Sequence, residues 1–226
     1  MALPGFTDIR CGTLQNHPSV GFVELARPLK FNAFNAAMWR EFPAAVRAVE
    51  AIASVRAVLV FAEGRHFCTG IDIEFLKDTF LPFAQPPASR SEGLHDNGSS
   101  SGSRPGPNTP APTPACPGLA RESMRRGILG MQDAYSALER CRWPVIAAIH
   151  GAAMHLALTA QTVSAGEALR LGLVSRVVEG SGQEAVRSAG VALAAQMAAK
   201  PSLALLGTKR VLLHASKAAE RPRAKM

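Results

Sequence analysis

Two short, uninterrupted apolar runs constrain the fold of this chain more than any other feature of its sequence. Residues 57–62 read AVLVFA and residues 144–149 read PVIAAI. A strand with one face in water alternates apolar and polar residues, whereas a strand covered on both faces does not. Both runs therefore predict strands buried on both faces. With the helical patterns around them, they predict an α/β architecture.

The other elements follow from local patterns. Residues 20–26 predict a strand that stops at the Arg27-Pro28 step, because proline cannot continue a hydrogen-bonded ladder. Apolar residues recur at helical spacing over residues 35–52, where Pro43 is expected to kink or shorten the helix. Similar patterns predict further helices at 72–80, 119–140, 164–171, 183–200 and 202–214, and a strand at 173–178.

Residues 82–118 differ in composition from the rest of the chain. They hold nine of the sixteen prolines and the run NGSSSGS. Such a segment buries too little apolar surface to offset the entropy lost on ordering. We predict a disordered Pro/Ser/Gly-rich insertion between two parts of a folded core.

Composition narrows the classes of partner. The formal net charge is +8 and the pI is about 9.9, which favours anionic partners. The basic residues accompany no recognisable nucleic-acid motif, so nucleic acid is not an expected partner. Four separated cysteines predict no metal site, and the apolar window at 143–160 is too interrupted for a membrane span.

Four sequence pieces occur in an order and context that resemble the crotonase, or enoyl-CoA hydratase/isomerase, superfamily. They are ELARPLKFNAFN, VLVFAEGRHFCTGIDI, CRWPVIAAIHGA and EALRLGLVSRVV. The run MWREF, the TGID version of the second piece and the ending GLVSRV resemble the dienoyl-CoA isomerase branch. The resemblance implies a crotonase-like spiral of β-β-α units, and excluding the insertion it covers most of the chain.

The resemblance also implies a site for an acyl-CoA thioester, with no cofactor beyond the coenzyme A of the substrate. Removing a proton beside a thioester carbonyl places negative charge on its oxygen, which backbone N–H donors stabilise. By resemblance, the N–H of Ile71 after Gly70 is one such donor. The residues implied in substrate binding are Lys30, Ala33, Thr69, Gly70, Ile71, Asp72 and Ile73.

The chain departs from the family pattern after the second apolar run. His150-Gly151-Ala152-Ala153 passes directly into Met154, which resembles a much later family segment. The resemblance therefore implies an internal deletion near 153–154, which removes the segment that carries the family's second oxyanion donor and its proton-moving carboxylates. Asp72 and Glu74 are the nearby carboxylates that could substitute as a general base, and Asp72 is a weak candidate, because a helix-start role is more common for such a residue.

These observations divide the chain into four parts. Residues 1–81 are the N-terminal half of an incomplete crotonase-like core, 82–118 the insertion, 119–179 the remainder of the core, and 180–226 the C-terminal helices and tail. Removing a central block should expose sheet edges and apolar faces, so we expect marginal stability or aggregation.

The last three residues, Ala224-Lys225-Met226, resemble a peroxisomal address that an import receptor reads from a free C-terminus. We expect a peroxisomal location, and a cytoplasmic one otherwise. The family resemblance adds a homotrimer or hexamer as a possible assembly.

Three functions remain open at this point. The first is an acyl-CoA isomerase of fatty-acid β-oxidation, which the sequence does not separate from a hydratase because the discriminating acids are absent. The second is a catalytically inactive relative, or truncated product, that retains at most acyl-CoA binding. The third is a basic interaction protein whose proline-rich insertion binds domains that read polyproline II helices.

Overall fold

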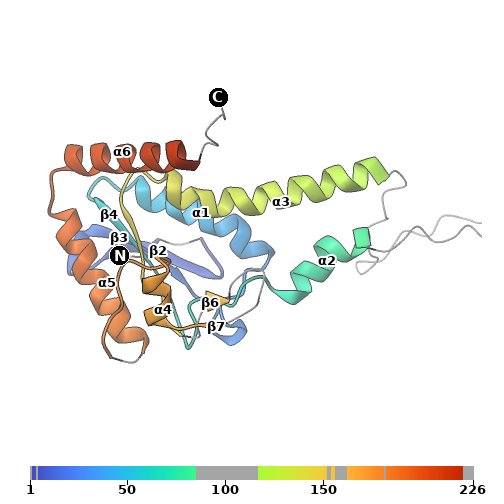
Figure 1. Cartoon of the computed structure of the whole chain (residues 1–226), viewed down its shortest axis with the longest axis horizontal. Coiled ribbons are helices and arrows are strands. Elements are labelled where there is room, and N and C mark those ends of the chain that lie inside the picture. Colours follow the sequence, from blue (N-terminus) through green and yellow to red (C-terminus); the bar gives the residue numbers. More distant parts are fainter. Residues whose placement is uncertain are drawn as a thin grey trace, which may run out of the picture.

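A five-stranded mixed sheet forms the centre of the computed structural model, which describes residues 2–3, 5–84, 117–151, 154–155, 162–180 and 182–220 (Figure 1). The strands run in the order β1 to β5. The first three pair antiparallel, and β3, β4 and β5 pair parallel. Their bounds are β1 Ala2–Leu3, β2 Ile9–Leu14, β3 His17–Leu25, β4 Ala57–Ala62 and β5 Val145–Ala147.

Strand β4 is buried along its whole length, as predicted. Alternate residues of β4 face opposite layers, because side chains of a strand alternate across the sheet. Val58, Val60 and Ala62 join the core formed with α1 (Ala36–Glu50) and α3 (Pro117–Arg140). Ala57, Leu59 and Phe61 join a second core under α5 (Gln183–Ala198).

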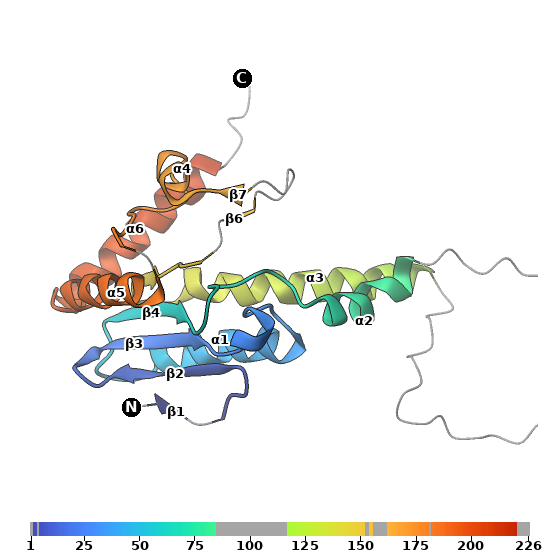
Figure 2. The ribbon, with the colours of Figure 1, turned by 90° about the horizontal axis from the view of Figure 1, so that it is seen from below.

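The remaining elements lie outside this centre. In Figure 2, α2 (Ile73–Ala84) and α3 extend together away from the sheet, and α4 (Ala165–Arg170) and α6 (Ser202–Glu220) lie beyond α5. A 3-10 turn, η1 (Pro28–Lys30), follows β3. Strands β6 (Met154–His155) and β7 (Thr162–Val163) pair antiparallel.

All six predicted helices are present, and α1 shows why. Asn35 caps its first turn, since the Asn35 side chain accepts a hydrogen bond of 2.9 Å from the N–H of Met38. The helix continues past Pro43 to Glu50, so the predicted shortening at the proline is wrong. Packing of the buried face of α1 against the sheet outweighs the one hydrogen bond that Pro43 cannot make.

Three further predictions need correction. The run at 144–149 forms an edge strand that is partly exposed, because no described strand pairs with its outer side. Residues 173–178 form no strand; the N–H groups of Leu173 and Val174 instead bond to the carbonyl of Ala168 at the end of α4. Residues 82–84 and 117–118 of the predicted insertion belong to α2 and α3, whereas 85–116 lie outside the described residues.

Among the described helices, none alone is long and apolar enough to cross a membrane. Helices α5 and α6 pass that test only as a pair bent by 109°, and α5 packs on the sheet.

Candidate functional site

The candidate site is built where the chain leaves β3 and where it leaves β4. The segment after β3 lies along the loop that joins β4 to α2, and backbone hydrogen bonds hold the two together. The N–H of Phe34 bonds to the carbonyl of Gly70 at 2.8 Å, and the N–H of Asp72 bonds to the carbonyl of Phe34 at 3.0 Å. Phe34 and Ile71 thus form an isolated parallel bridge.

Asn32 ties both segments to the end of β4. Its side chain is fully buried. The side-chain oxygen accepts from the N–H of Arg27 at 2.9 Å, while Nδ2 donates to the carbonyls of Glu63 and His66, each at 2.8 Å. Asn32 has a φ of 56°, a left-handed conformation that asparagine tolerates better than most residues. This side chain therefore fixes the shape of the loop that carries Ile71.

The N–H of Ile71 lies at the tip of that loop, between two N–H groups that are engaged. The neighbouring N–H of Gly70 points to Cys68 Sγ at 3.4 Å, and that of Asp72 bonds to Phe34. Ile71 itself donates to no acceptor in the described part of the chain and is 37% exposed. Gly70 makes this turn possible, because its φ of 103° is strained for any residue with a side chain.

The three carboxylates beside this loop are each paired with a cation. Asp72 is 7% exposed, and its Oδ2 accepts from Arg27 Nη1 at 2.6 Å. Glu63 pairs with Arg10 at 2.6 Å, and Glu74 lies 4.0 Å from the ammonium of Lys30. None of the three carboxylates is an unpaired base in this structure.

Asp72 also caps α2, because its Oδ1 accepts from the N–H of Glu74 at 2.9 Å. The hydrogen bond from Arg27 holds the pKa of the Asp72 carboxyl below its usual value; burial opposes this, and the Glu74 N–H assists it. A lowered pKa makes Asp72 a weak proton acceptor at neutral pH. The helix-start role considered for Asp72 is therefore present in the structure.

The end of β5 meets the same loop. His150 Nε2 lies 2.9 Å from the carbonyl of Gly64, and the N–H of Phe67 bonds to the carbonyl of His150 at 3.1 Å. Gly151, with a φ of 91°, sits directly against the backbone of Arg65 and His66, where no side chain fits. The carboxyl ends of the parallel strands β4 and β5 are thus brought together, as expected at one edge of a parallel sheet.

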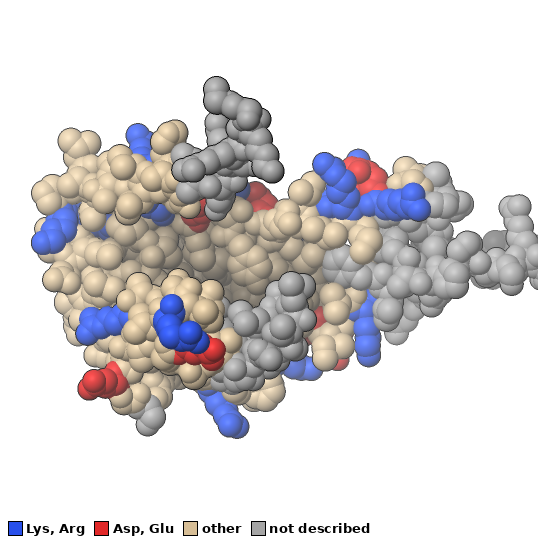
Figure 3. Space-filling view, viewed as in Figure 1, with Lys and Arg blue, Asp and Glu red and all other residues tan. Residues whose placement is uncertain are grey.

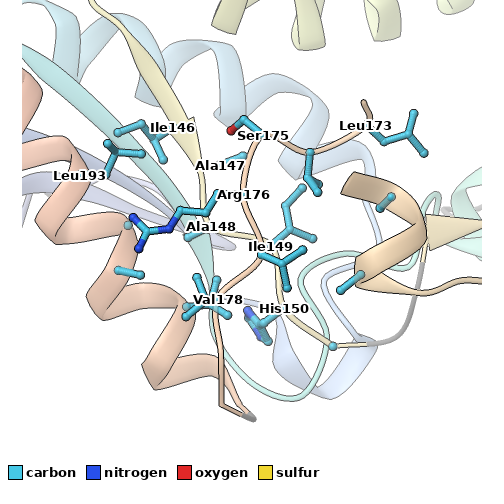
Figure 4. Close-up of a pocket in the computed structure, with 18 of the residues that line it drawn as sticks. Ile146, Ala147, Ala148, Ile149, His150, Leu173, Ser175, Arg176, Val178 and Leu193 are labelled. Atoms are coloured by element: carbon cyan, nitrogen blue, oxygen red, sulfur yellow. The ribbon is translucent and has the colours of Figure 1, made fainter. Parts of the chain in front are cut away.

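A hollow of about 560 Å³ opens beyond β5 (Figure 4). Aliphatic side chains dominate its walls, which come from β5 and the residues after it, from α4, from residues 173–178 and from α5. His150 and Gly151 line the hollow, but residues 66–73 of the loop do not. Its volume lies within the range typical of ligand pockets.

The predicted site residues fall into two groups. Lys30, Ala33 and residues 69–73 are brought together by the hydrogen bonds between the two segments. Residues 224–226 and the junction at 152–153 lie outside the described residues. Sequence reasoning missed Arg27 and Asn32, whose partners in the β4–α2 loop are 31 to 45 positions away in the chain.

Comparison with known proteins agrees with this architecture. Residues 20–84 match the family model described as Enoyl-CoA hydratase/isomerase. The peroxisomal Delta(3,5)-Delta(2,4)-dienoyl-CoA isomerase of Arabidopsis thaliana is 30% identical over 246 residues, covering 86% of this chain and 77% of the relative. The mitochondrial human enzyme of the same name is 26% identical, with 92% of this chain and 69% of the relative covered.

Solved structures show the same fold. An enoyl-CoA hydratase/isomerase from Xanthobacter autotrophicus Py2 matches with a TM-score of 0.70 at 20% identity, covering 95% of this chain and 82% of that one. A putative enoyl-CoA hydratase from Streptomyces coelicolor A3(2) gives a TM-score of 0.64 at 21% identity, with 97% and 82% covered. The fold and the identity to the Arabidopsis protein place this chain in the enoyl-CoA hydratase/isomerase, or crotonase, superfamily.

Proposed function

We propose that this chain binds acyl-CoA thioesters at the β4–α2 loop and does not turn them over. The observation that carries this proposal is the unused N–H of Ile71 at the tip of a loop held by Asn32 and the Phe34 bridge. A thioester carbonyl accepting from this N–H would be polarised without reorganisation of the loop. Lys30, 55% exposed at the side of the loop, supplies a cation for the phosphates of coenzyme A.

We propose no turnover because the described carboxylates beside the loop are paired with cations. Isomerising a dienoyl-CoA requires a group that removes a proton beside the thioester and a group that returns one. In the described part of the site, Asp72 and Glu63 each lie 2.6 Å from a guanidinium, and Glu74 is largely exposed beside Lys30. The 246-residue alignment with the Arabidopsis enzyme is longer than this 226-residue chain, so it contains positions where only the relative has residues.

The alternative is a dienoyl-CoA isomerase of fatty-acid β-oxidation in which Asp72 moves the proton. The similarity to dienoyl-CoA isomerases favours this reading. A location in the peroxisome and assembly into a trimer or hexamer belong to the same proposal. They are tested by imaging the chain with and without Ala224-Lys225-Met226 and by measuring its mass in solution.

One experiment separates the two functions. The purified chain is titrated with a dienoyl-CoA by calorimetry, and the same mixture is followed spectroscopically for isomerisation. We expect saturable binding that is weakened by Lys30→Glu, with no change in the dienoyl absorbance beyond the uncatalysed rate. Turnover that is abolished by Asp72→Asn would establish the isomerase instead, and an absence of binding would refute both.

A further inference from the structure

The outer side of β5 carries backbone groups that pair with nothing in the described chain. Towards β4, the carbonyl of Pro144 accepts from Val58 at 2.9 Å and the N–H of Ala148 donates to Val60 at 2.8 Å. Because hydrogen-bonding direction alternates along a strand, the N–H and carbonyl groups of Val145 and Ala147 point the other way. They face the hollow that these residues line.

Residues 173–178 form the opposite wall of the same hollow. Figure 4 shows Ser175, Arg176 and Val178 on this segment, which runs past Ala147 and Ala148. No backbone group from Ser175 to Val178 makes a hydrogen bond to another described residue. The hollow is therefore a slot between two backbones, each with donors and acceptors that bond to no other described residue, and aliphatic side chains of α4 and α5 form much of the remaining wall.

A cationic side chain also lines this slot. Arg176 lines the hollow and makes no ion pair with any described Asp or Glu. Arg170 on α4, by comparison, lies 3.3 Å from Glu167. The surrounding face shows more Lys and Arg than Asp and Glu side chains (Figure 3), in keeping with the net charge of +8. An occupant with a negative charge would complement Arg176.

We propose that the slot binds an extended segment of another protein, about five residues long, as an added strand between β5 and residues 173–178. The length follows from the lining residues 145–149, since a paired strand of equal length presents one residue to each. The segment carries aliphatic side chains for the walls and one acidic side chain for Arg176. This site is independent of the acyl-CoA site proposed above.

The backbone groups distinguish a peptide from other occupants. A fatty-acid chain fits the aliphatic walls and its carboxylate suits Arg176, but it would cover the N–H and carbonyl groups of Val145 and Ala147 without satisfying them. Besides β5, the described edge strands that a second copy of this chain could offer are β1, β6 and β7, and each has only two residues, too few to pair along residues 145–149. A peptide strand can pack aliphatic side chains on the walls, form hydrogen bonds with the backbone groups of Val145 and Ala147, and place a carboxylate beside Arg176.

The test uses the full chain labelled with ¹⁵N and the peptide acetyl-Val-Thr-Val-Glu-Val-amide as probe. We expect saturable shifts at the amides of Val145 and Ala147, and an affinity that falls roughly tenfold when the central valine of the peptide is N-methylated and one hydrogen bond is lost. Arg176→Glu should weaken binding by a similar factor, whereas the matched variant Arg170→Glu should not.

A second variant tests the edge directly. Ala147→Pro removes an outward N–H while leaving the inward bonds of β5 to β4, because proline is tolerated at edge positions that donate to nothing. It should weaken peptide binding and leave acyl-CoA binding unchanged. The proposal is overturned if N-methylation has no effect, if laurate but not the peptide shifts these amides, or if the chain self-associates through β5 and excludes the peptide.

Discussion

Asn32 is the residue on which the geometry of the candidate site depends most. It is buried, adopts a left-handed backbone conformation, and satisfies one N–H and two carbonyls that belong to three different parts of the loop region. An unsatisfied buried polar group costs more than a typical hydrogen bond contributes. Loss of this one amide therefore disturbs both the segment after β3 and the loop that carries Ile71.

Replacing Asn32 with alanine should lower the free energy of unfolding by about 2–4 kcal/mol, because it leaves buried backbone groups without partners. Urea denaturation of the chain and the variant measures this. Asn32→Gly is the matched control, since glycine accepts the left-handed conformation but makes none of the side-chain hydrogen bonds. If Asn32→Gly is as stable as the parent chain, the hydrogen bonds contribute nothing and this account of Asn32 is wrong.

Asp72 should make the stability of the chain depend on acid. The hydrogen bond from Arg27 lowers the pKa of Asp72 in the folded state below its ordinary value of 3.8. Its contribution is therefore complete above pH 3.8 and is lost as pH falls through the lower folded-state value. Unfolding measured across this range should show a shallower acid decline for Asp72→Asn. An identical decline in both proteins would rule out the pair as its source.

Helices and strands were predicted correctly where their own residues determine them. Strand β4 and helices α1 and α4 follow from composition and spacing, so their positions agree with the sequence. Two predictions were wrong: that β5 is buried on both faces, and that residues 173–178 form a strand. Both depended on neighbouring strands, which a local sequence pattern does not reveal. Helices α2 and α3 contact one another, and each extends a few residues into the proline-rich segment.

The candidate site divides in the same way. Ile71 and Gly70 were reached from a motif, because a positive φ and a free donor are properties of one short turn. The Arg27–Asp72 pair joins residues 45 positions apart, and only the fold brings them to 2.6 Å. The sequence alone could not show whether Asp72 is available as a base, because the ion pair with Arg27 appears only in the fold.

The end of α3 depends on a residue of α6. The ammonium of Lys209 donates to the carbonyls of Leu138, Cys141 and Trp143, at and just beyond the C-terminus of α3. Carbonyls at the end of a helix have no partner within the helix, so Lys209 supplies one. A cation at this end also opposes the helix dipole favourably.

Lys209→Met should destabilise the chain by about 1–3 kcal/mol, because the methionine keeps the aliphatic stem and leaves the carbonyls unsatisfied. Lys217→Met, a change on the same helix as Lys209, removes an exposed pair with Glu139 of α3 and should leave the stability nearly unchanged. Thermal unfolding of both variants provides the comparison. Equal losses would show that Lys209 acts as an ordinary surface lysine.

Across the whole molecule, the chain combines a complete first half with an open second half. One face of β4 is covered by α1 and α3 and the other by α5, whereas β5 ends the sheet beside an aliphatic hollow. The β4–α2 loop, which we propose binds the thioester, follows β4. This division is consistent with the proposal that Ile71 binds a thioester carbonyl while the described carboxylates beside its loop are paired with cations.

The most direct test of this account observes the Ile71 amide itself. The ¹⁵N-labelled chain is titrated with a dienoyl-CoA thioester and with the corresponding thioether, which lacks the carbonyl. We predict a downfield shift of the Ile71 amide proton with the thioester only, since only the thioester offers an oxygen to that N–H. Equal shifts with both ligands, or none with either, would contradict a carbonyl-binding role for the β4–α2 loop.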